Sequence, residues 1–532
     1  MLRDPPLPND VEIRTTDFES TAGFLQEGAF PHRVGYGKRL FPRRRVLEAA
    51  VFGTYLGILI WAAWVHEPWA DEVQSWLLAR DLSPLGLVSH QLRHEGSPGL
   101  WQLLLWPLAH AHLPIMALTA FGAALAALGV ALLIFLSPLP LVLRLLLPFT
   151  YYFVYQYAAI SRPYNLLLLL ACLLAASFSS RFDRPLRYTG ILCLICGVSI
   201  PSMLIAGTLF LVFLIEAYGR VGEWSRFVAL VRYPVALFGA VGLGLLAILW
   251  PTRDIASPIT NYLVPSPIEF GKNVAAVLFR SSFSGLPWLN AAVIVAVCLW
   301  LYRRCRLVNF LLPVIAYVLF SSIKVHQAFF DGLFVVLLVF ALWIGYETKP
   351  TRLIRLRRGT SALNSLTLGL IVVAGLVQVW WSGLAIVWDT GHNYGPGPAA
   401  MRFLAEHRLA SDVIATDGEY WPIELQPYLP RGHFDNLAVP GAYYHFSWSE
   451  DFSNNLFRPI IDRRAQVLIS SPQGYSMKVN PPVPKFAGYR LVTKIPGEVY
   501  WPDSRDPGKD DLLIYLRDDI PLLPFTHTAE AG

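Results

Sequence analysis

The chain has 532 residues, of which 55% are hydrophobic and only 15% are charged. Soluble globular chains carry roughly 45–50% apolar and about 25% charged residues, and disordered chains are less hydrophobic still. The composition therefore excludes a single soluble domain and a disordered protein. The net charge of +6 does not indicate nucleic-acid binding, because Lys and Arg collect in short clusters between apolar runs, as in the cytoplasmic loops of membrane proteins.

The N-terminal 45 residues are polar and end in a basic cluster, which predicts a mobile tail on the cytoplasmic side. Nearly all of the apolar surplus lies in residues 46–390. A membrane-spanning helix needs about 20 mostly apolar residues. Twelve apolar segments are candidates: 46–65, 98–113, 115–136, 141–158, 163–179, 188–201, 203–218, 230–250, 286–302, 307–323, 327–346 and 362–389.

Charge predicts the orientation of these segments. A second basic cluster at 349–358 precedes the last apolar segment, so the C-terminal region should lie outside the cell. A cytoplasmic N-terminus and an external C-terminus require an odd number of crossings. We therefore expect an α-helical polytopic protein of the cell (inner or plasma) membrane with eleven spans, and thirteen as the alternative.

Three polar regions remain outside the bilayer in this scheme. Residues 66–97 and 251–285 should form external loops. Residues 391–532 mix a helical stretch at 398–409 with short alternating runs at 412–416 and 466–470, which are typical of strands. The last region is therefore expected to fold as an extracytoplasmic α/β domain.

The first external loop has the most informative sequence. Asp71 and Glu72 begin a segment in which four residues recur at helical spacing: Val73, Trp76, Leu77 and Arg80. This spacing predicts an amphipathic helix that lies on the membrane surface. Acidic residues at a helix N-terminus can simply favour the helix dipole. Alternatively, a carboxylate held at the membrane surface can accept a proton from an acceptor hydroxyl.

A second acidic group follows in the same loop. His94 and Glu95 precede the next apolar segment, and together with Asp71 they could bind Mg²⁺ or Mn²⁺. The alternative is that they serve loop polarity and helix capping. We expect no resident cofactor, and the chain has no P-loop and no dinucleotide-binding fingerprint.

Three motifs carry a resemblance to a known superfamily: Asp71-Glu-Val-Gln-Ser-Trp-Leu77, Ile160-Ser-Arg-Pro-Tyr164 and Lys324-Val-His-Gln-Ala-Phe-Phe-Asp-Gly332. With the Glu-Gly-Ser-Pro entry at 95–98, they resemble the GT-C integral-membrane glycosyltransferases, in the branch of the protein O-mannosyltransferases and aminoarabinose transferases. The resemblance covers roughly residues 46–390. The third motif departs from the pattern, with Lys324 in place of Arg and extra residues before the glycine.

The resemblance implies a reaction and a set of site residues. The donor would be a polyprenyl-phosphate sugar and the acceptor an extracytoplasmic glycan, lipid or protein, with inversion at the anomeric carbon. Asp71 would be the catalytic base and Glu72 a supporting carboxylate. Arg162 would face the donor phosphate, and Tyr164 belongs to the same motif. Further candidates near the donor phosphate or the substrate are selected by their place in the sequence and not by the resemblance: Lys324, His326, His94 and Glu95. For Lys324 and His326, an ordinary helix-end role stays open.

Two other functions are compatible with the same composition. One is a transporter or flippase of polyprenyl-linked glycans, although no internal repeat of the kind that transporters show is visible. The other is a non-catalytic scaffold of the cell envelope, in which Asp71 would be dispensable. Transfer of a sugar that depends on Asp71 separates the glycosyltransferase from both.

Overall fold

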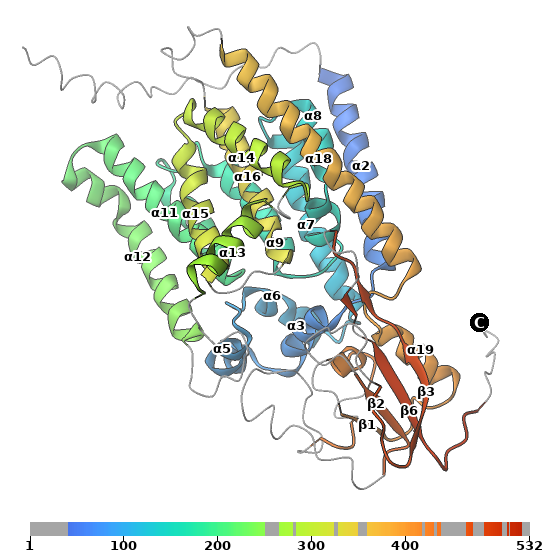
Figure 1. Ribbon diagram of the computed structural model, residues 1–532. Coiled ribbons are helices and arrows are strands. Elements are labelled where there is room, and N and C mark those ends of the chain that lie inside the picture. The colour runs from blue at the N-terminus through green and yellow to red at the C-terminus, as the bar shows by residue number, and fades with distance from the viewer. Residues whose placement is uncertain are drawn as a thin grey trace, which may run out of the picture.

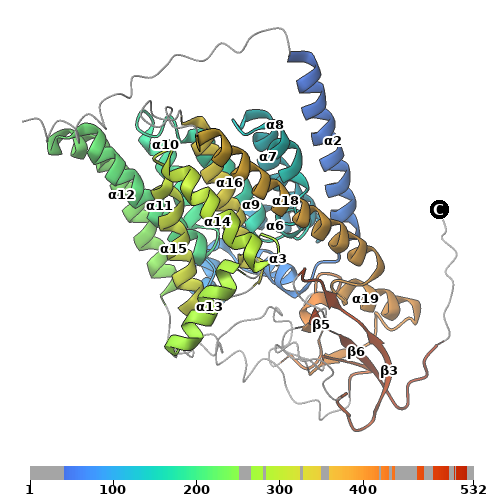
Figure 2. The ribbon, with the colours of Figure 1, turned by 45° about the horizontal axis from the view of Figure 1, so that its top comes forward.

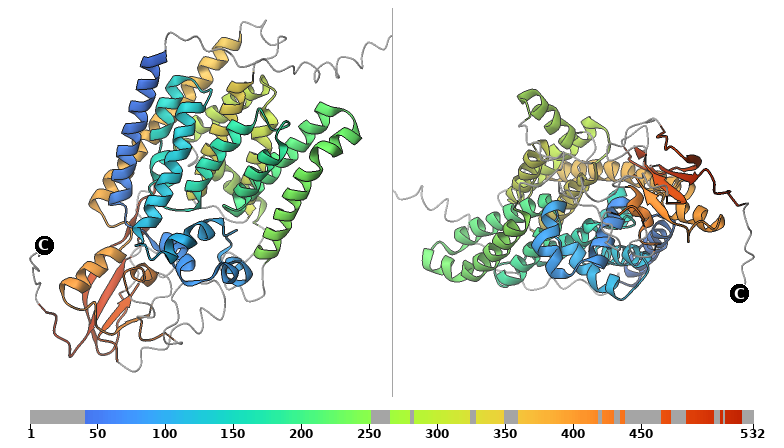
Figure 3. Two further views of the ribbon diagram at one scale, coloured as in Figure 1. Left: turned by 180° about the vertical axis from the view of Figure 1, so that it is seen from behind. Right: turned by 90° about the horizontal axis from the view of Figure 1, so that it is seen from below.

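In the computed structural model the chain is mostly helical, with a small sheet near its C-terminus. The helices form a bundle, a layer of short helices closes one end of it, and the sheet lies beyond that same end (Figures 1 and 3). The structure describes residues 41–250, 265–279, 283–323, 328–348, 359–417, 421–429, 434–437, 464–471, 483–502, 508–509 and 511–523.

Within the described residues, five helices are long and apolar enough to cross a bilayer: α2 (Phe41–Val65), α7 (Met116–Leu136), α11 (Ile200–Val221), α12 (Trp224–Leu249) and α18 (Gly359–Gly391). Five shorter apolar helices accompany them: α9 (Pro163–Ser177), α10 (Pro185–Cys196), α14 (Pro287–Tyr302), α15 (Leu307–Ile323) and α16 (Gly332–Glu347). Helices α2 and α12 lie on opposite flanks of the bundle (Figure 2). These helices fit a membrane protein, and the number of eleven crossings stays a prediction.

The apolar segments 98–113 and 141–158 do not each form a single helix of spanning length. The segment 98–113 contains α6 (Leu100–His110), which at 1.5 Å per residue is about 17 Å long and too short for a bilayer. The segment 141–158 is divided into α8 (Leu141–Leu146), the 3₁₀ turn η2 (Leu147–Phe149) and the π-turn η3 (Tyr152–Gln156). In the region expected to be the second external loop, residues 267–279 form the helix α13 (Pro267–Phe279).

Helices α7 and α9 pack closely because glycine faces the contact. A Cβ atom at Gly129 would lie 3.0 Å from the backbone nitrogen of Leu169, and one at Gly122 would lie 2.8 Å from the Ser161 hydroxyl. Small residues allow helix backbones to approach in this way, since no side chain separates them. The contact fixes the position of the chain that leads into α9.

The layer at the bundle end contains α3 (Ala70–Asp81), α4 (Pro84–Gly86), η1 (Leu87–Gln91), α5 (Leu92–Glu95) and α6. The predicted helix at the start of the first loop is present as α3. The helix is more buried than a helix lying alone on the membrane surface would be, because nine of its twelve residues are buried. Helix α6 and the 3₁₀ turn η6 (Trp421–Leu425) pack against it and cover the faces that were expected to meet lipid and water.

The C-terminal region contains a four-stranded sheet in the order β1-β2-β6-β3. Strands β1 (Ile414–Thr416) and β2 (Val467–Ser470) are parallel, whereas β6 (Leu512–Arg517) is antiparallel to both β2 and β3 (Tyr489–Ile495). A short antiparallel pair is formed by β4 (Glu498–Val499) and β5 (Gly508–Lys509). With α19 (Gly397–Glu406), these elements match the predicted mixture of one helix and short strands.

Glycines bring the C-terminal region tightly against the junction between α2 and α3. A Cβ atom at Gly395 would lie 2.5 Å from the carbonyl oxygen of Pro68, which leaves room only for glycine. An ion pair of 3.3 Å joins Arg402 of α19 to Glu67. The Nε1 atom of Trp388 in α18 donates to the carbonyl of Glu498 in β4 at 3.3 Å. The α2–α3 junction is therefore held between the bundle and the sheet.

Candidate active site

Asp71 and Arg162 meet at the end of the bundle that carries the short-helix layer. Asp71 lies in the first turn of α3, and Arg162 is the residue before α9. An Arg162 nitrogen and an Asp71 carboxylate oxygen are 2.9 Å apart, with side-chain exposures of 14% and 27%. The pair is thus partly desolvated yet open to a ligand.

The backbone around Arg162 is fixed by its own helix start. Pro163 begins α9, where its missing N–H costs nothing because that group has no helical partner in any case. The backbone N–H of Arg162 donates to the side-chain oxygen Oδ1 of Asn165 at 2.8 Å, and the side-chain Nδ2 of Asn165 donates to the backbone carbonyl of Ala158 at 2.9 Å. Asn165 therefore closes the loop that presents Arg162.

Aromatic rings surround the guanidinium. Its central carbon lies 4.1 Å from the ring centroid of Phe329, 5.6 Å from that of Trp69 and 5.9 Å from that of Tyr164. Tyr164 is buried and stacks on Tyr157 at 4.8 Å, so the motif tyrosine belongs to the wall of the site. Cations over aromatic faces are attracted by the ring quadrupole, and this holds the guanidinium in place without neutralising its charge.

Glu72 is fully buried beside this pair. One of its carboxylate oxygens accepts the backbone N–H of Ser161 at 2.5 Å, directly before Arg162. The other oxygen accepts the N–H of Trp69 at 3.3 Å, which caps the first turn of α3, and lies 2.8 Å from Nε2 of His66. Asp71 and Glu72 have different surroundings, as the 100° turn between adjacent helical residues requires.

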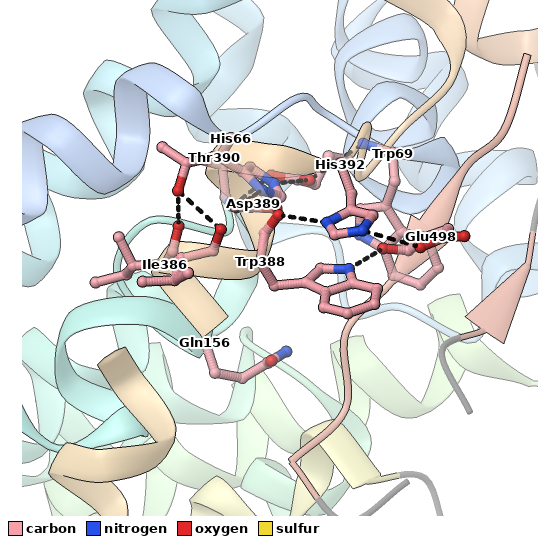
Figure 4. A network of polar contacts seen from close by, with 12 residues as sticks. His66, Trp69, Gln156, Ile386, Trp388, Asp389, Thr390, His392 and Glu498 are labelled. Atoms are coloured by element: carbon pink, nitrogen blue, oxygen red, sulfur yellow. Dashed lines mark hydrogen bonds and ion pairs between the residues drawn. The ribbon is translucent and has the colours of Figure 1, made fainter. Parts of the chain in front are cut away.

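His66 and Asp389 lie beside Glu72, although neither residue was expected to belong to the site. Nδ1 of His66 lies 3.0 Å from the Asp389 carboxylate, and both side chains are fully buried (Figure 4). His66 directly follows α2, and Asp389 is close to the C-terminal end of α18. Their position in the sequence could have identified them, because an ionisable residue at the end of an apolar segment is a candidate functional group.

Glu95 and His94 lie on α5, near the same carboxylates. The side-chain amides of Gln74 and Gln91 both donate to one oxygen of Glu95 at 2.9 Å. Burial, with a smaller contribution from the negative charge of Asp71, raises the pKa of Glu95 from 4.5 to about 7, against the effect of these two hydrogen bonds. A carboxyl group with such a pKa can exchange protons near neutral pH.

The geometry does not support the cation site that was considered for Asp71, His94 and Glu95. Within the described part of the chain, no three His, Cys, Asp or Glu side chains gather closely enough to hold a metal ion. The ring of buried His94 instead lies 5.1 Å from that of His90. The carboxylate of Glu95 accepts hydrogen bonds from the side-chain amides of Gln74 and Gln91.

Lys324 and His326 lie outside the described residues, so their predicted place near the donor phosphate stays a prediction. Of their motif, Phe329 reaches the site, and its carbonyl accepts the hydroxyl of Tyr157 at 2.6 Å. Asp331 is fully buried at the start of α16.

Other buried or partly buried charged side chains form ion pairs away from this site. Arg144 is 2.5 Å from Glu48 near the start of α2. Glu216 bridges Arg181 at 2.9 Å and Arg306 at 3.2 Å. These ion pairs link neighbouring helices to one another.

No protein-family model, no curated protein and no solved structure matches this chain. The chemistry of the site therefore rests on its own side chains. A carboxylate and a guanidinium in contact, flanked by aromatic rings and partly open, can bind an anionic group and accept a proton next to it.

Proposed function

We propose that the chain is a membrane glycosyltransferase that moves a sugar from a polyprenyl-phosphate donor to an extracytoplasmic glycan, lipid or protein. The observation that carries this proposal is the contact between Asp71 and Arg162 at the end of an apolar helix bundle. The two side chains come from two of the three motifs that carry the GT-C resemblance. The reaction needs those two groups, a base for the acceptor and a cation for the leaving phosphate.

The donor would change the pairing of Asp71. Arg162 can form two parallel hydrogen bonds to a phosphate, and these would compete with its 2.9 Å contact to the Asp71 carboxylate. When the phosphate takes over this contact with the guanidinium, the Asp71 carboxylate would accept the proton of an acceptor hydroxyl. Binding of the donor and activation of the base are coupled in this scheme.

The chemical step is a single displacement. The acceptor oxygen forms a bond to the anomeric carbon while the bond from that carbon to the phosphate oxygen breaks, and the configuration inverts. The proton of the acceptor moves to Asp71. The lipid phosphate leaves with the bonding electron pair, and Arg162 stabilises its developing charge.

An apolar cavity supports a lipid-linked donor. It has a volume of about 420 Å³, lies between α2 and α7, and is almost entirely hydrophobic. Such a cavity between two membrane-spanning helices could hold part of an isoprenoid chain. Its lining residues are Leu56, Leu59, Ile60, Ala63, Trp64, Met116, Thr119, Ala120, Ala123, Ala124 and Ala127.

The proposal places the site on the external face of the cell membrane. Arg43 to Arg45 and Arg303 to Arg306 lie at the bundle end opposite the Asp71–Arg162 pair, and cytoplasmic ends of membrane proteins are enriched in such residues. The N-terminus would then be cytoplasmic. The C-terminal sheet would be extracytoplasmic, beside the site, where it could contact the acceptor.

The test is an assay in proteoliposomes that contain the purified protein. A panel of labelled polyprenyl-phosphate sugars is supplied with an acceptor fraction from cell envelopes. Covalent transfer of label to an acceptor supports the glycosyltransferase. Movement of an intact lipid-linked glycan across the bilayer without transfer would favour the transporter, and binding without either event would favour the scaffold.

A further inference from the structure

His66 lies between two carboxylates in the interior of the protein. Its Nε2 atom is 2.8 Å from Glu72 and its Nδ1 atom is 3.0 Å from Asp389, and none of the three side chains is exposed (Figure 4). A ring that donates to both carboxylates carries a proton on each nitrogen. The arrangement is that of a buried imidazolium shared by Glu72 and Asp389.

The surroundings of His66 favour the charged ring. Burial alone would lower its pKa, but the charges of Glu72 and Asp389 outweigh burial and raise the pKa of His66 to about 10. Other titratable groups facing it are the phenols of Tyr155 and Tyr394, whose ring centroids lie 6.4 Å and 4.7 Å away, and the neighbouring carboxylate of Glu67.

The three residues join elements that are far apart in the chain. His66 directly follows α2, Glu72 lies in α3, and Asp389 lies in α18. Glu72 uses its remaining oxygen to accept the N–H of Ser161, the residue before Arg162. A continuous path of hydrogen bonds therefore leads from α18 through the imidazolium to the loop that presents the guanidinium.

We propose that His66 is a positioning residue: as an imidazolium anchored by Asp389, it holds Glu72 against Ser161 and thereby sets Arg162 against Asp71. Its effect on sugar transfer rests on the function proposed above, whereas its effect on the Ser161 loop does not. Without the cation, two buried carboxylates would face one another, and Glu72 could not keep both its charge and its place.

Three variants test this role. Asp389→Asn keeps an oxygen that can accept from the ring but removes one of the two charges that stabilise the imidazolium. His66→Gln removes the cation altogether. Glu48→Gln is the matched control, because it removes a buried carboxylate from an ion pair with Arg144 at the other end of α2.

The first measurement is amide hydrogen exchange of the peptide around Ser161 in detergent-solubilised protein. We expect exchange to rise about tenfold in His66→Gln, the factor that corresponds to the loss of one hydrogen bond. Asp389→Asn should show a smaller rise, and Glu48→Gln none. Unchanged exchange at Ser161 in both His66→Gln and Asp389→Asn would overturn the proposal, as would an equal rise in Glu48→Gln.

The second measurement is the pH profile of sugar transfer. A simple packing role would leave the profile in place, but a required imidazolium makes its alkaline limb report the pKa of His66. Asp389→Asn should move that limb to lower pH by about one unit or more. An unmoved limb in an active Asp389→Asn variant contradicts the proposal. If the wild-type protein transfers no sugar, the proposed function fails, and the exchange measurement alone decides the role of His66.

Discussion

The carboxylate of Asp71 and the guanidinium of Arg162 are in contact at 2.9 Å, although one belongs to α3 and the other precedes α9. The close packing of α7 and α9 and the buried contact between Glu72 and Ser161 bring them together. The pair is partly open, in contrast to the fully buried carboxylates beside it. The proposed function requires an anionic ligand to reach Arg162 through this opening.

Replacing Arg162 by Lys should weaken binding of a polyprenyl phosphate by about tenfold or more. A lysine keeps the charge but loses the planar pair of donors that matches a phosphate. The measurement is equilibrium binding of undecaprenyl phosphate to protein in detergent. Arg402→Lys, at the exposed pair with Glu67, is the control and should bind as the wild type does. Equal binding by Arg162→Lys would contradict the assignment of Arg162.

The glycine contact between α7 and α9 should be sensitive to one methyl group. In Gly129→Ala, the added Cβ meets the Leu169 backbone at 3.0 Å, so overpacking should cost about 1–3 kcal/mol of unfolding free energy. Gly207→Ala in α11 is the matched control, because nothing lies within 4 Å of its Cβ position. It should be neutral or slightly stabilising, since alanine favours helices. Thermal unfolding in detergent gives both values, and equal stability of the two variants would refute this packing.

The raised pKa of Glu95 predicts a pH dependence of stability. The folded protein binds the Glu95 proton more tightly than the unfolded chain does, because the pKa rises from 4.5 to about 7 on folding. The resulting stabilisation is complete below about pH 4.5 and is lost as the pH rises to about 7, with a maximum of about 3 kcal/mol. Glu95→Gln should abolish the decline in this window. Thermal unfolding from pH 4.5 to 7.5 measures it, and an identical decline in the variant would show that another group is responsible.

The orientation of the chain can be tested with a natural cysteine. Cys305 is exposed within the basic cluster that the proposed topology places in the cytoplasm. In right-side-out vesicles, a membrane-impermeant maleimide should label it only after the membrane is permeabilised, and Cys305→Ser should remove that label. The exposed Asp519, changed to Cys in a Cys305→Ser background, should react before permeabilisation. The reverse pattern would invert the topology.

The sequence predicted the long apolar helices, the helix after Asp71 and the short strands of the C-terminal region, because these depend on local composition and periodicity. It did not predict the burial of α3, since the covering elements α6 and η6 come from distant parts of the chain. It also overestimated the length of continuous helix in two apolar segments, 98–113 and 141–158. Apolar composition alone does not distinguish a spanning helix from short helices buried inside the protein.

The motif residues Asp71 and Arg162 could be selected from the sequence. Their contact could not be predicted, because it depends on how α3 packs relative to the start of α9. His66 and Asp389 carry no motif at all. Each is a single polar residue at the end of an apolar segment, and only the packing of α2 against α18 brings them together. Long-range pairing of this kind is invisible to local patterns.

The most direct test of the central claim compares sugar transfer by Asp71→Asn and Asp81→Asn. Both changes neutralise a carboxylate of α3, but Asp81 is paired with Arg80 in the last turn, outside the site. With a labelled polyprenyl-phosphate sugar and an acceptor that the wild type uses, Asp71→Asn should lose about 10²-fold or more of the rate, while its donor binding persists. Asp81→Asn should remain close to the wild-type rate. Transfer at the wild-type rate by a folded Asp71→Asn protein would contradict the account.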